Sequence, residues 1–227
     1  KDENNGSFSA PFKTLEVARN AARKIDGQVV INLREGVYLI ENTLELTSED
    51  SNTVYRAYKD EKVIINGANI LEPAEFKTID AEKKALIIDQ KSASNIKMID
   101  LKSKGITENG TLYVNDKRMV ISRYPNEGYV ETGEVLEVGK NNSAEGWTIR
   151  VDAVTKGRMK KWTYSKNIML FGYFMHDWSD ANLGVKEFDA EKGTLSSTWN
   201  DYYGITAERR YYYYNLLEEL DAPGEWY

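Results

Sequence analysis

The sequence contains no cysteine among its 227 residues. Disulfides, thiolate metal sites and cysteine nucleophiles are therefore all excluded. Histidine is nearly absent as well, because His176 is the only one. A single histidine argues against a multi-histidine metal site and against a choice of bases for a serine triad. From the sequence we expect neither a metal site nor a cofactor.

Long apolar runs are also missing, since no stretch approaches the roughly 18 residues of a membrane-spanning helix. Positive charge is in deficit: 36 acidic and 30 basic side chains give a formal net charge of −6 and a pI of about 5.1. Nucleic acids and anionic membranes are therefore not expected partners. The densest basic run, residues 156–161, is interpreted as a solvated loop or strand edge.

What is abundant is tyrosine, with 15 residues against 6 phenylalanines and 5 tryptophans. Tyrosine and tryptophan combine a flat apolar face with a polar edge, which suits sugar rings and also suits the surfaces of β-sheets. With 41% hydrophobic and 29% charged residues, the composition is that of a soluble globular protein.

The first predicted element is a helix over residues 13–25, which ends before Gly27. Its apolar residues recur at helical spacing along one face: Leu15, Val17, Ala18, Ala21, Ala22 and Ile25. Because short β segments follow, we expect this helix to cover the open end of a sheet.

From Gln28 to about Ile106 the pattern changes to short β segments separated by polar or glycine-bearing turns. No second strong helix interrupts them, so βαβ crossovers are not expected. A sandwich or barrel and a β-solenoid with turns of roughly 20 to 25 residues both remain open. We predict parallel pairing of Val63–Ile65 with the strands around Leu44–Leu46 and Leu86–Ile88. The β segments are at 29–33, 36–40, 43–46, 53–58, 62–67, 85–89 and 95–101.

After Gly105 the spacing becomes irregular and alternates as in hairpins. We predict a separate antiparallel β domain from Thr107 to about Asn200, with Trp162, Phe171 and Phe174 in its core. Its predicted strands cover 111–115, 117–122, 134–138, 147–151, 168–174, 184–188 and 194–197.

Several motifs carry a resemblance to known proteins. The segment Ser9–Leu15 with its alanine-rich helix, and then Val30–Tyr38, resembles the opening of pectin-lyase-like right-handed parallel β-helix proteins. Val63–Ala68 is similar to their recurrent coil, which ends in an Asn-Gly turn. Four further segments resemble the insertion domain of glycoside hydrolase family 141-like proteins and the return to their β-helix: 114–119, 123–128, 172–178 and 214–227.

The resemblance implies a mainly β fold: the start of a right-handed parallel β-helix capped by an N-terminal helix, with an inserted antiparallel β domain. It implies three ranges: 1–106 for the cap and first coils, 107–200 for the insert, and 201–227 for the return segment. It also implies a secreted or cell-surface protein whose partner is a polysaccharide or oligosaccharide. Activities near that family include α-fucosidase and endo-xylanase, so the resemblance does not select one substrate.

The expected function is that of the N-terminal segment of a glycoside hydrolase acting on plant-type polysaccharide. Hydrolysis needs two carboxyl groups on either side of a sugar, and we expect that pair to lie beyond this chain, so no catalytic residue is assigned. Two alternatives stay open: a non-catalytic carbohydrate-binding or cell-surface module, and a polysaccharide lyase or epimerase.

The candidate substrate-binding residues are Asp177, Trp178 and Asp180. In one interpretation the indole stacks on a sugar whose hydroxyl groups bond to the two carboxylates. In the other, Trp178 fills the core of the insert and the acids cap a turn. The run Arg209–Tyr214 is either a sugar-binding platform or a packing segment. Since strand residues alternate between faces, at most two of its tyrosines can line one groove.

Overall fold

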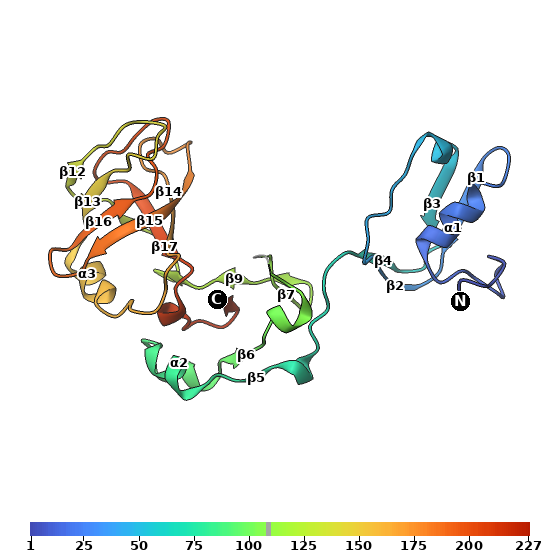
Figure 1. Ribbon diagram of the computed structural model, residues 1–227, viewed down its shortest axis with the longest axis horizontal. Coiled ribbons are helices and arrows are strands. Elements are labelled where there is room, and N and C mark those ends of the chain that lie inside the picture. Colours follow the sequence, from blue (N-terminus) through green and yellow to red (C-terminus); the bar gives the residue numbers. More distant parts are fainter. Residues whose placement is uncertain (108–109) are drawn as a thin grey trace. The chain divides into compact units, whose positions relative to one another are not determined.

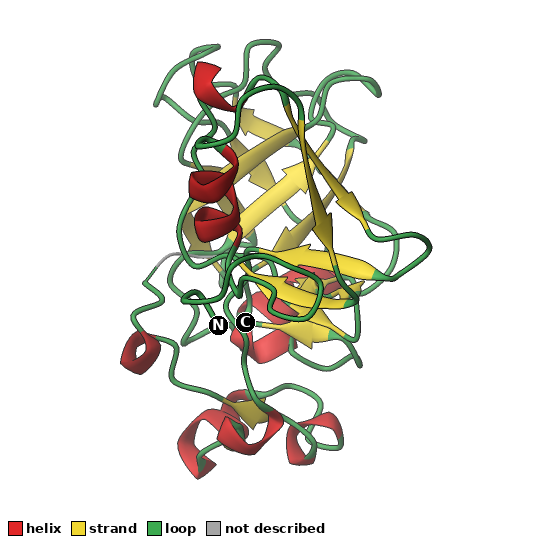
Figure 2. Ribbon diagram, turned by 90° about the vertical axis from the view of Figure 1, so that its right-hand side faces the viewer, coloured by secondary structure: helices red, strands yellow, loops and turns green. Residues whose placement is uncertain are grey.

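The computed structural model describes residues 1–107 and 110–227. These divide into two compact units, Lys1–Glu72 and Pro73–Tyr227, which are called here the N-terminal and the C-terminal unit. Strands and loops dominate and the helices are short (Figure 2). The mainly β character predicted from the sequence is confirmed.

The N-terminal unit begins with helix α1 (Leu15–Ala22), shorter than the predicted 13–25. Thr14 caps it by accepting a hydrogen bond from the Val17 backbone, as N-cap residues do. Leu15, Ala18 and Ala22 are buried and the helix lies against β1, so the predicted inward-facing helix is confirmed. Ile25 is the exception: it lies beyond the helix and is 58% exposed.

Two parallel two-stranded ladders follow α1 (Figure 1). β1 (Val29–Leu33) pairs with β3 (Thr53–Ala57), and β2 (Gly36–Leu39) pairs with β4 (Val63–Asn66). The 3-10 helix Ser48–Asp50 precedes β3 and is held by a capping box with Thr47.

The predicted parallel pairing of Val63–Ile65 is confirmed, but its predicted partners are wrong. Leu44–Leu46 forms no strand, and the carbonyl of Glu45 accepts a hydrogen bond from Arg19 of α1. Leu86 ends helix α2 (Ala81–Leu86), in which Asp80 accepts a hydrogen bond from the Lys83 backbone. That N-cap, followed by alanine, glutamate and lysine, favours a helix over a strand.

The C-terminal unit contains an eight-stranded sheet whose pairings are all antiparallel. The order is β10-β17-β14-β15-β16-β13-β12. β11 stands outside this order and pairs with Arg210 and Tyr211 of β17. The antiparallel β-structure predicted for this region is thereby confirmed, although the sheet also includes Arg210–Tyr214, beyond the predicted end at about Asn200. The strands are β10 (Arg123–Tyr124), β11 (Val130–Glu131), β12 (Val135–Glu137), β13 (Thr148–Arg150), β14 (Met169–Gly172), β15 (Ala181–Asp189), β16 (Thr194–Ser197) and β17 (Arg210–Tyr214).

Helix α3 (Ala153–Met159) lies between β13 and β14 in sequence. The basic run 156–161, predicted as a loop or strand edge, therefore begins inside a helix. The reason is local: Asp152 accepts hydrogen bonds from the backbone N–H groups of Val154 and Thr155 and so starts the helix.

Short elements complete the C-terminal unit. The segment 216–227 contains the 3-10 helix Leu217–Glu219 and β18 (Glu225–Trp226), and β18 pairs in parallel with β9 (Val120–Ile121). The remaining 3-10 helices are Pro73–Glu75, Ser92–Ser94 and Lys102–Lys104. The other strands are β5 (Lys77–Thr78), β6 (Lys97–Met98), β7 (Tyr113–Val114), β8 (Lys117–Arg118), β9 (Val120–Ile121) and β18 (Glu225–Trp226).

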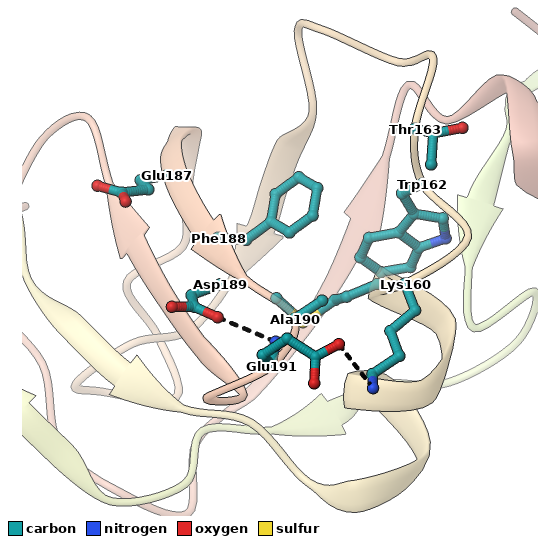
Figure 3. Close-up of a pocket in the computed structure, with 9 residues that line it drawn as sticks. Lys160, Trp162, Thr163, Glu187, Phe188, Asp189, Ala190 and Glu191 are labelled. Carbon is teal, nitrogen blue, oxygen red and sulfur yellow. Dashed lines mark hydrogen bonds and ion pairs between the residues drawn. The ribbon is translucent and has the colours of Figure 1, made fainter.

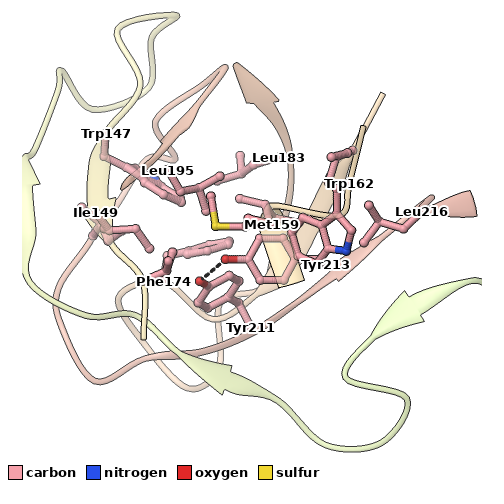
Figure 4. Packing of buried hydrophobic residues seen from close by; sticks show 14 residues of the cluster. Trp147, Ile149, Met159, Trp162, Phe174, Leu183, Leu195, Tyr211, Tyr213 and Leu216 are labelled. Carbon is pink, nitrogen blue, oxygen red and sulfur yellow. Dashed lines mark hydrogen bonds between the residues drawn. The ribbon is translucent and has the colours of Figure 1, made fainter. Parts of the chain in front are cut away.

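The core of the sheet is a large cluster of apolar and aromatic side chains (Figure 4). Trp162 and Phe174 belong to it as predicted, whereas Phe171 is half-buried on the opposite side of β14. Tyr211 and Tyr213 of β17 are fully buried in it and share a hydrogen bond of 2.6 Å between their hydroxyl oxygens. The range predicted as a return segment, 201–227, thus supplies a strand that pairs with β10, β11 and β14.

Candidate functional site

A shallow groove lies between the end of α3 and the end of β15 (Figure 3). Its volume is about 450 Å³, and it includes the rings of Trp162 and Phe188, whose centroids are 6.4 Å apart. The acids around it already have protein partners: Glu191 accepts from Lys160 Nζ at 2.9 Å, and Asp189 accepts from the backbone of Glu191 and Lys192. These contacts fit a stabilised turn better than a catalytic pair.

The predicted residues Asp177, Trp178 and Asp180 lie elsewhere, in the loop between β14 and β15. Trp178 is 68% exposed, so the interpretation that it fills the core is wrong. Leu170 of β14 and Phe174, two residues beyond it, already fill the core on this side, and the chain has left the sheet when it reaches residue 178. The indole is therefore presented to solvent.

Neighbouring rings fix the position of this exposed indole. His176 stacks on Trp178 with ring centroids 5.2 Å apart and planes 4° from parallel. Tyr203 meets both rings edge-on, at 5.2 Å and 5.0 Å, and Tyr202 packs against Tyr203. These four residues, called here the indole cluster, join the β14–β15 loop to the segment before β17. Tyr202 is itself 66% exposed, and clustered exposed aromatic surface of this kind marks interaction sites.

The two acids beside the indole keep most of their hydrogen-bonding capacity. Asp177 lies 3.6 Å from Arg209 and 4.0 Å from Arg210, with its side chain 70% exposed. These distances exceed those of a good charge-assisted hydrogen bond. Asp180 is exposed. Both carboxylates can therefore accept hydrogen bonds from a ligand next to the indole.

Buried Thr132 shapes the backbone that carries the two arginines. Its hydroxyl donates to the carbonyl of Thr206 and accepts from the Arg209 backbone, each at 2.8 Å. Its backbone N–H donates to the carbonyl of Arg209. Glu208, just before, has a φ of 61°, in the left-handed region that a non-glycine residue rarely adopts. The start of β17 is thus held in one conformation.

Alternation along β17 then separates its side chains. Tyr211 and Tyr213 enter the core, while Arg210, Tyr212 and Tyr214 lie on the outer face. The prediction that at most two tyrosines share a face is confirmed for this strand.

Sequence reasoning missed two buried carboxylates, Glu218 and Glu219. Glu218 accepts hydrogen bonds from the backbone of Tyr164 and from both the backbone and the hydroxyl of Ser165. Glu219 accepts from Trp162 Nε1 at 2.6 Å and from Arg158 at 2.8 Å. Two acids inside the apolar run Leu216–Leu220 are the signal that could have indicated them.

Burial raises the pKa of Glu219 to about 7, although the Trp162 and Arg158 contacts act in the opposite direction. Since protein donors already occupy the oxygens of both acids, they attach the segment 216–227 to the C-terminal unit rather than face a ligand.

Within residues 1–107 and 110–227, no group of three or more histidine, cysteine, aspartate or glutamate side chains is placed to hold a metal ion. Over the same residues, no helix combines the length and the apolar character that a membrane crossing requires. Comparison of the sequence and structure with family models, curated proteins and solved structures finds no match.

Proposed function

We propose that this chain is a carbohydrate-binding segment of a secreted or cell-surface carbohydrate-active β-helix protein, and that the indole cluster with Asp177 and Asp180 contacts the sugar. The observation that carries the proposal is the exposed indole of Trp178, fixed by His176 and Tyr203. A rigid aromatic face can stack on the apolar side of a pyranose ring. The adjacent carboxylates can accept hydrogen bonds from its hydroxyl groups.

The N-terminal unit supports the β-helix part of the proposal. Val29 pairs with Thr53, 24 positions later, and Gly36 pairs with Val63, 27 positions later, both in parallel. Successive coils of a parallel solenoid place like strands in register at a spacing of this kind. In that interpretation, β1 and β2 belong to one coil and β3 and β4 to the next, with α1 against the first.

The proposal assigns binding, not turnover, to the described surface. Glycoside hydrolysis needs an acid and a second carboxylate at a defined separation around one sugar. Glu218 and Glu219 are enclosed by protein donors, and the exposed Asp177 and Asp180 are assigned here to binding. We therefore expect glycoside hydrolase activity on plant-type polysaccharide to require residues outside these.

The test measures binding of xylan oligosaccharides and fucosylated pectin fragments by calorimetry, with Trp178→Ala as the variant. Losing a stacked ring at the centre of a small site should weaken binding by about tenfold or more. The matched control is Tyr113→Ala, because Tyr113 is 59% exposed on β7 and is not part of the cluster. Equal affinity of wild type and Trp178→Ala would contradict the proposal.

Turnover of the same glycans provides a second check. The chain should release no sugars at an enzymatic rate. Robust release that is abolished by Asp177→Asn would place the chemistry in the β14–β15 loop and overturn the assignment.

A further inference from the structure

We infer a second sugar subsite beside the indole cluster, formed by Tyr129, Tyr173 and Arg210, so that one oligosaccharide chain contacts both places. This inference rests on the proposed function and deepens it, because it names an extended chain rather than a single sugar as the ligand. Tyr173 lies within the segment 172–178 noted in the sequence, but neither it nor Tyr129 was expected to bind a ligand.

The three side chains come together because of the register of the sheet. Arg210 lies on the outer face of β17, and Tyr129 directly precedes β11, whose Val130 pairs with Tyr211. Tyr173 directly follows β14, and its backbone N–H donates to the carbonyl of Arg210. The guanidinium carbon of Arg210 lies 4.4 Å from the Tyr173 ring centroid and 5.7 Å from that of Tyr129.

Tyr129 is the exposed ring of the group, at 43%. It contacts Tyr173 at 6.4 Å and Tyr212 at 5.8 Å between ring centroids. Arg123 lies 3.5 Å over the Tyr212 ring on the same face. Tyr129 is thus a fixed, partly open aromatic surface, as Trp178 is in the indole cluster.

Arg210 makes the two surfaces continuous. On one side it packs over Tyr173, and on the other it approaches Asp177, the residue before Trp178, at 4.0 Å. Within the part of the chain that the structure describes, its guanidinium donates no hydrogen bond within 3.5 Å. A guanidinium offers five N–H donors, and those that do not face Asp177 can donate to hydroxyl or ring oxygens of a sugar that passes between the two surfaces.

The character of the chain favours a glycan over other extended ligands. The formal net charge of −6 disfavours nucleic acid as the ligand. The surface offers flat rings, carboxylate acceptors and guanidinium donors side by side, and a polyhydroxylated ring uses all three.

The experiment compares xylobiose with xylohexaose in calorimetric titrations of the full chain. Wild type should bind the hexasaccharide more tightly than the disaccharide. Tyr129→Ala and Arg210→Gln should each remove most of that difference, about tenfold, by weakening hexasaccharide binding alone. Trp178→Ala should weaken both ligands.

Matched controls are Tyr113→Ala and Arg118→Gln, because both residues are exposed on the β7–β8 hairpin. Thermal unfolding identifies any variant that fails to fold. If Tyr129→Ala fails to fold, Tyr129→Phe replaces it. Because Tyr129→Phe keeps the ring, it should bind as wild type does.

The outcomes distinguish failure of the second subsite from failure of the proposed function. If wild type binds both ligands and Tyr129→Ala leaves hexasaccharide affinity unchanged, the second subsite is wrong and the proposed function stands. If Tyr129→Ala weakens both ligands equally, the two places are one site and the inference fails. If neither these ligands nor the fucosylated fragments bind, the proposed function fails, and the subsite with it.

Discussion

The N-terminal and C-terminal units use β-structure in opposite ways. In the N-terminal unit, two parallel ladders bury little: Val54, Ile64 and Ile65 are all at least 38% exposed. In the C-terminal unit, the antiparallel sheet folds around a core in which Trp147, Leu170 and Tyr213 are fully buried. The eight-stranded antiparallel sheet encloses its own core, whereas the two-stranded parallel ladders leave many of their apolar side chains exposed. The stability of the two units should therefore respond differently to the same kind of change.

The largest contrast is expected from core truncation. Phe174 is 2% exposed and packs against Trp147 and Tyr211. Phe174→Ala should lower the free energy of unfolding of the C-terminal unit by about 3–5 kcal/mol, because it removes buried apolar surface and leaves a cavity. Ile64→Ala, on exposed β4, should cost at most about 1 kcal/mol. Urea titrations followed by tryptophan fluorescence and by hydrogen exchange measure both, and comparable losses would refute the contrast.

The next contrast concerns the C-terminal unit as the pH rises through neutrality. The pKa of Glu219 is raised to about 7 by burial, above the value of an unfolded chain. Its contribution to stability is full below about pH 4.5 and is lost as the pH rises through 7. At about 1.4 kcal/mol per pKa unit, the loss is on the order of 3 kcal/mol. Glu219→Gln, which keeps the shape of the side chain, should flatten the pH dependence of the unfolding midpoint between pH 5 and 8.

The smallest contrast has the opposite sign and lies in the N-terminal unit. The hydrogen bonds that Asp50 accepts from Arg23 and from the Thr47 backbone lower its pKa to about 2. Its contribution is full above about pH 4 and is lost as the pH falls toward 2. The protection of residues 47–57 against hydrogen exchange, relative to the intrinsic rate at each pH, should therefore fall in acid, and Asp50→Asn should show the lower protection already at pH 6. Unchanged protection in that variant would exclude the mechanism.

Features that depend on neighbouring residues in the sequence were largely predictable. The apolar face of α1 and the strands β13, β14 and β16 follow from periodicity, and the loss of regular spacing after Gly105 indicated an antiparallel region. Features set by competing local interactions were not: the Asp80 and Asp152 caps produce helices where β structure or a loop was predicted. The strand that pairs with β4 also could not be predicted from the spacing of the β segments, because the turns that connect them differ in length.

Part of the candidate site was also predictable, because its residues are neighbours in the sequence. The sequence singled out Asp177, Trp178 and Asp180, but it could not decide whether the indole is buried or exposed. That depends on Tyr203, which is 25 residues away along the chain and 5.0 Å away between ring centroids. The buried acids Glu218 and Glu219 were missed because their donors, Trp162, Ser165 and Arg158, come from segments more than 50 residues earlier.

The place of β17 in the sheet has a consequence for the order of folding. β17 is the last strand of the sheet along the sequence, yet it lies between β10 and β14 and also pairs with β11. During synthesis, β14, β15 and β16 can form hairpins as they emerge, but β10 and β11 have no partner in the sheet until Tyr214 has been made. Pairings that span some 90 residues form slowly, because the intervening loop must be ordered before any contact is gained. The incomplete sheet therefore exposes unpaired edges, and such edges promote aggregation.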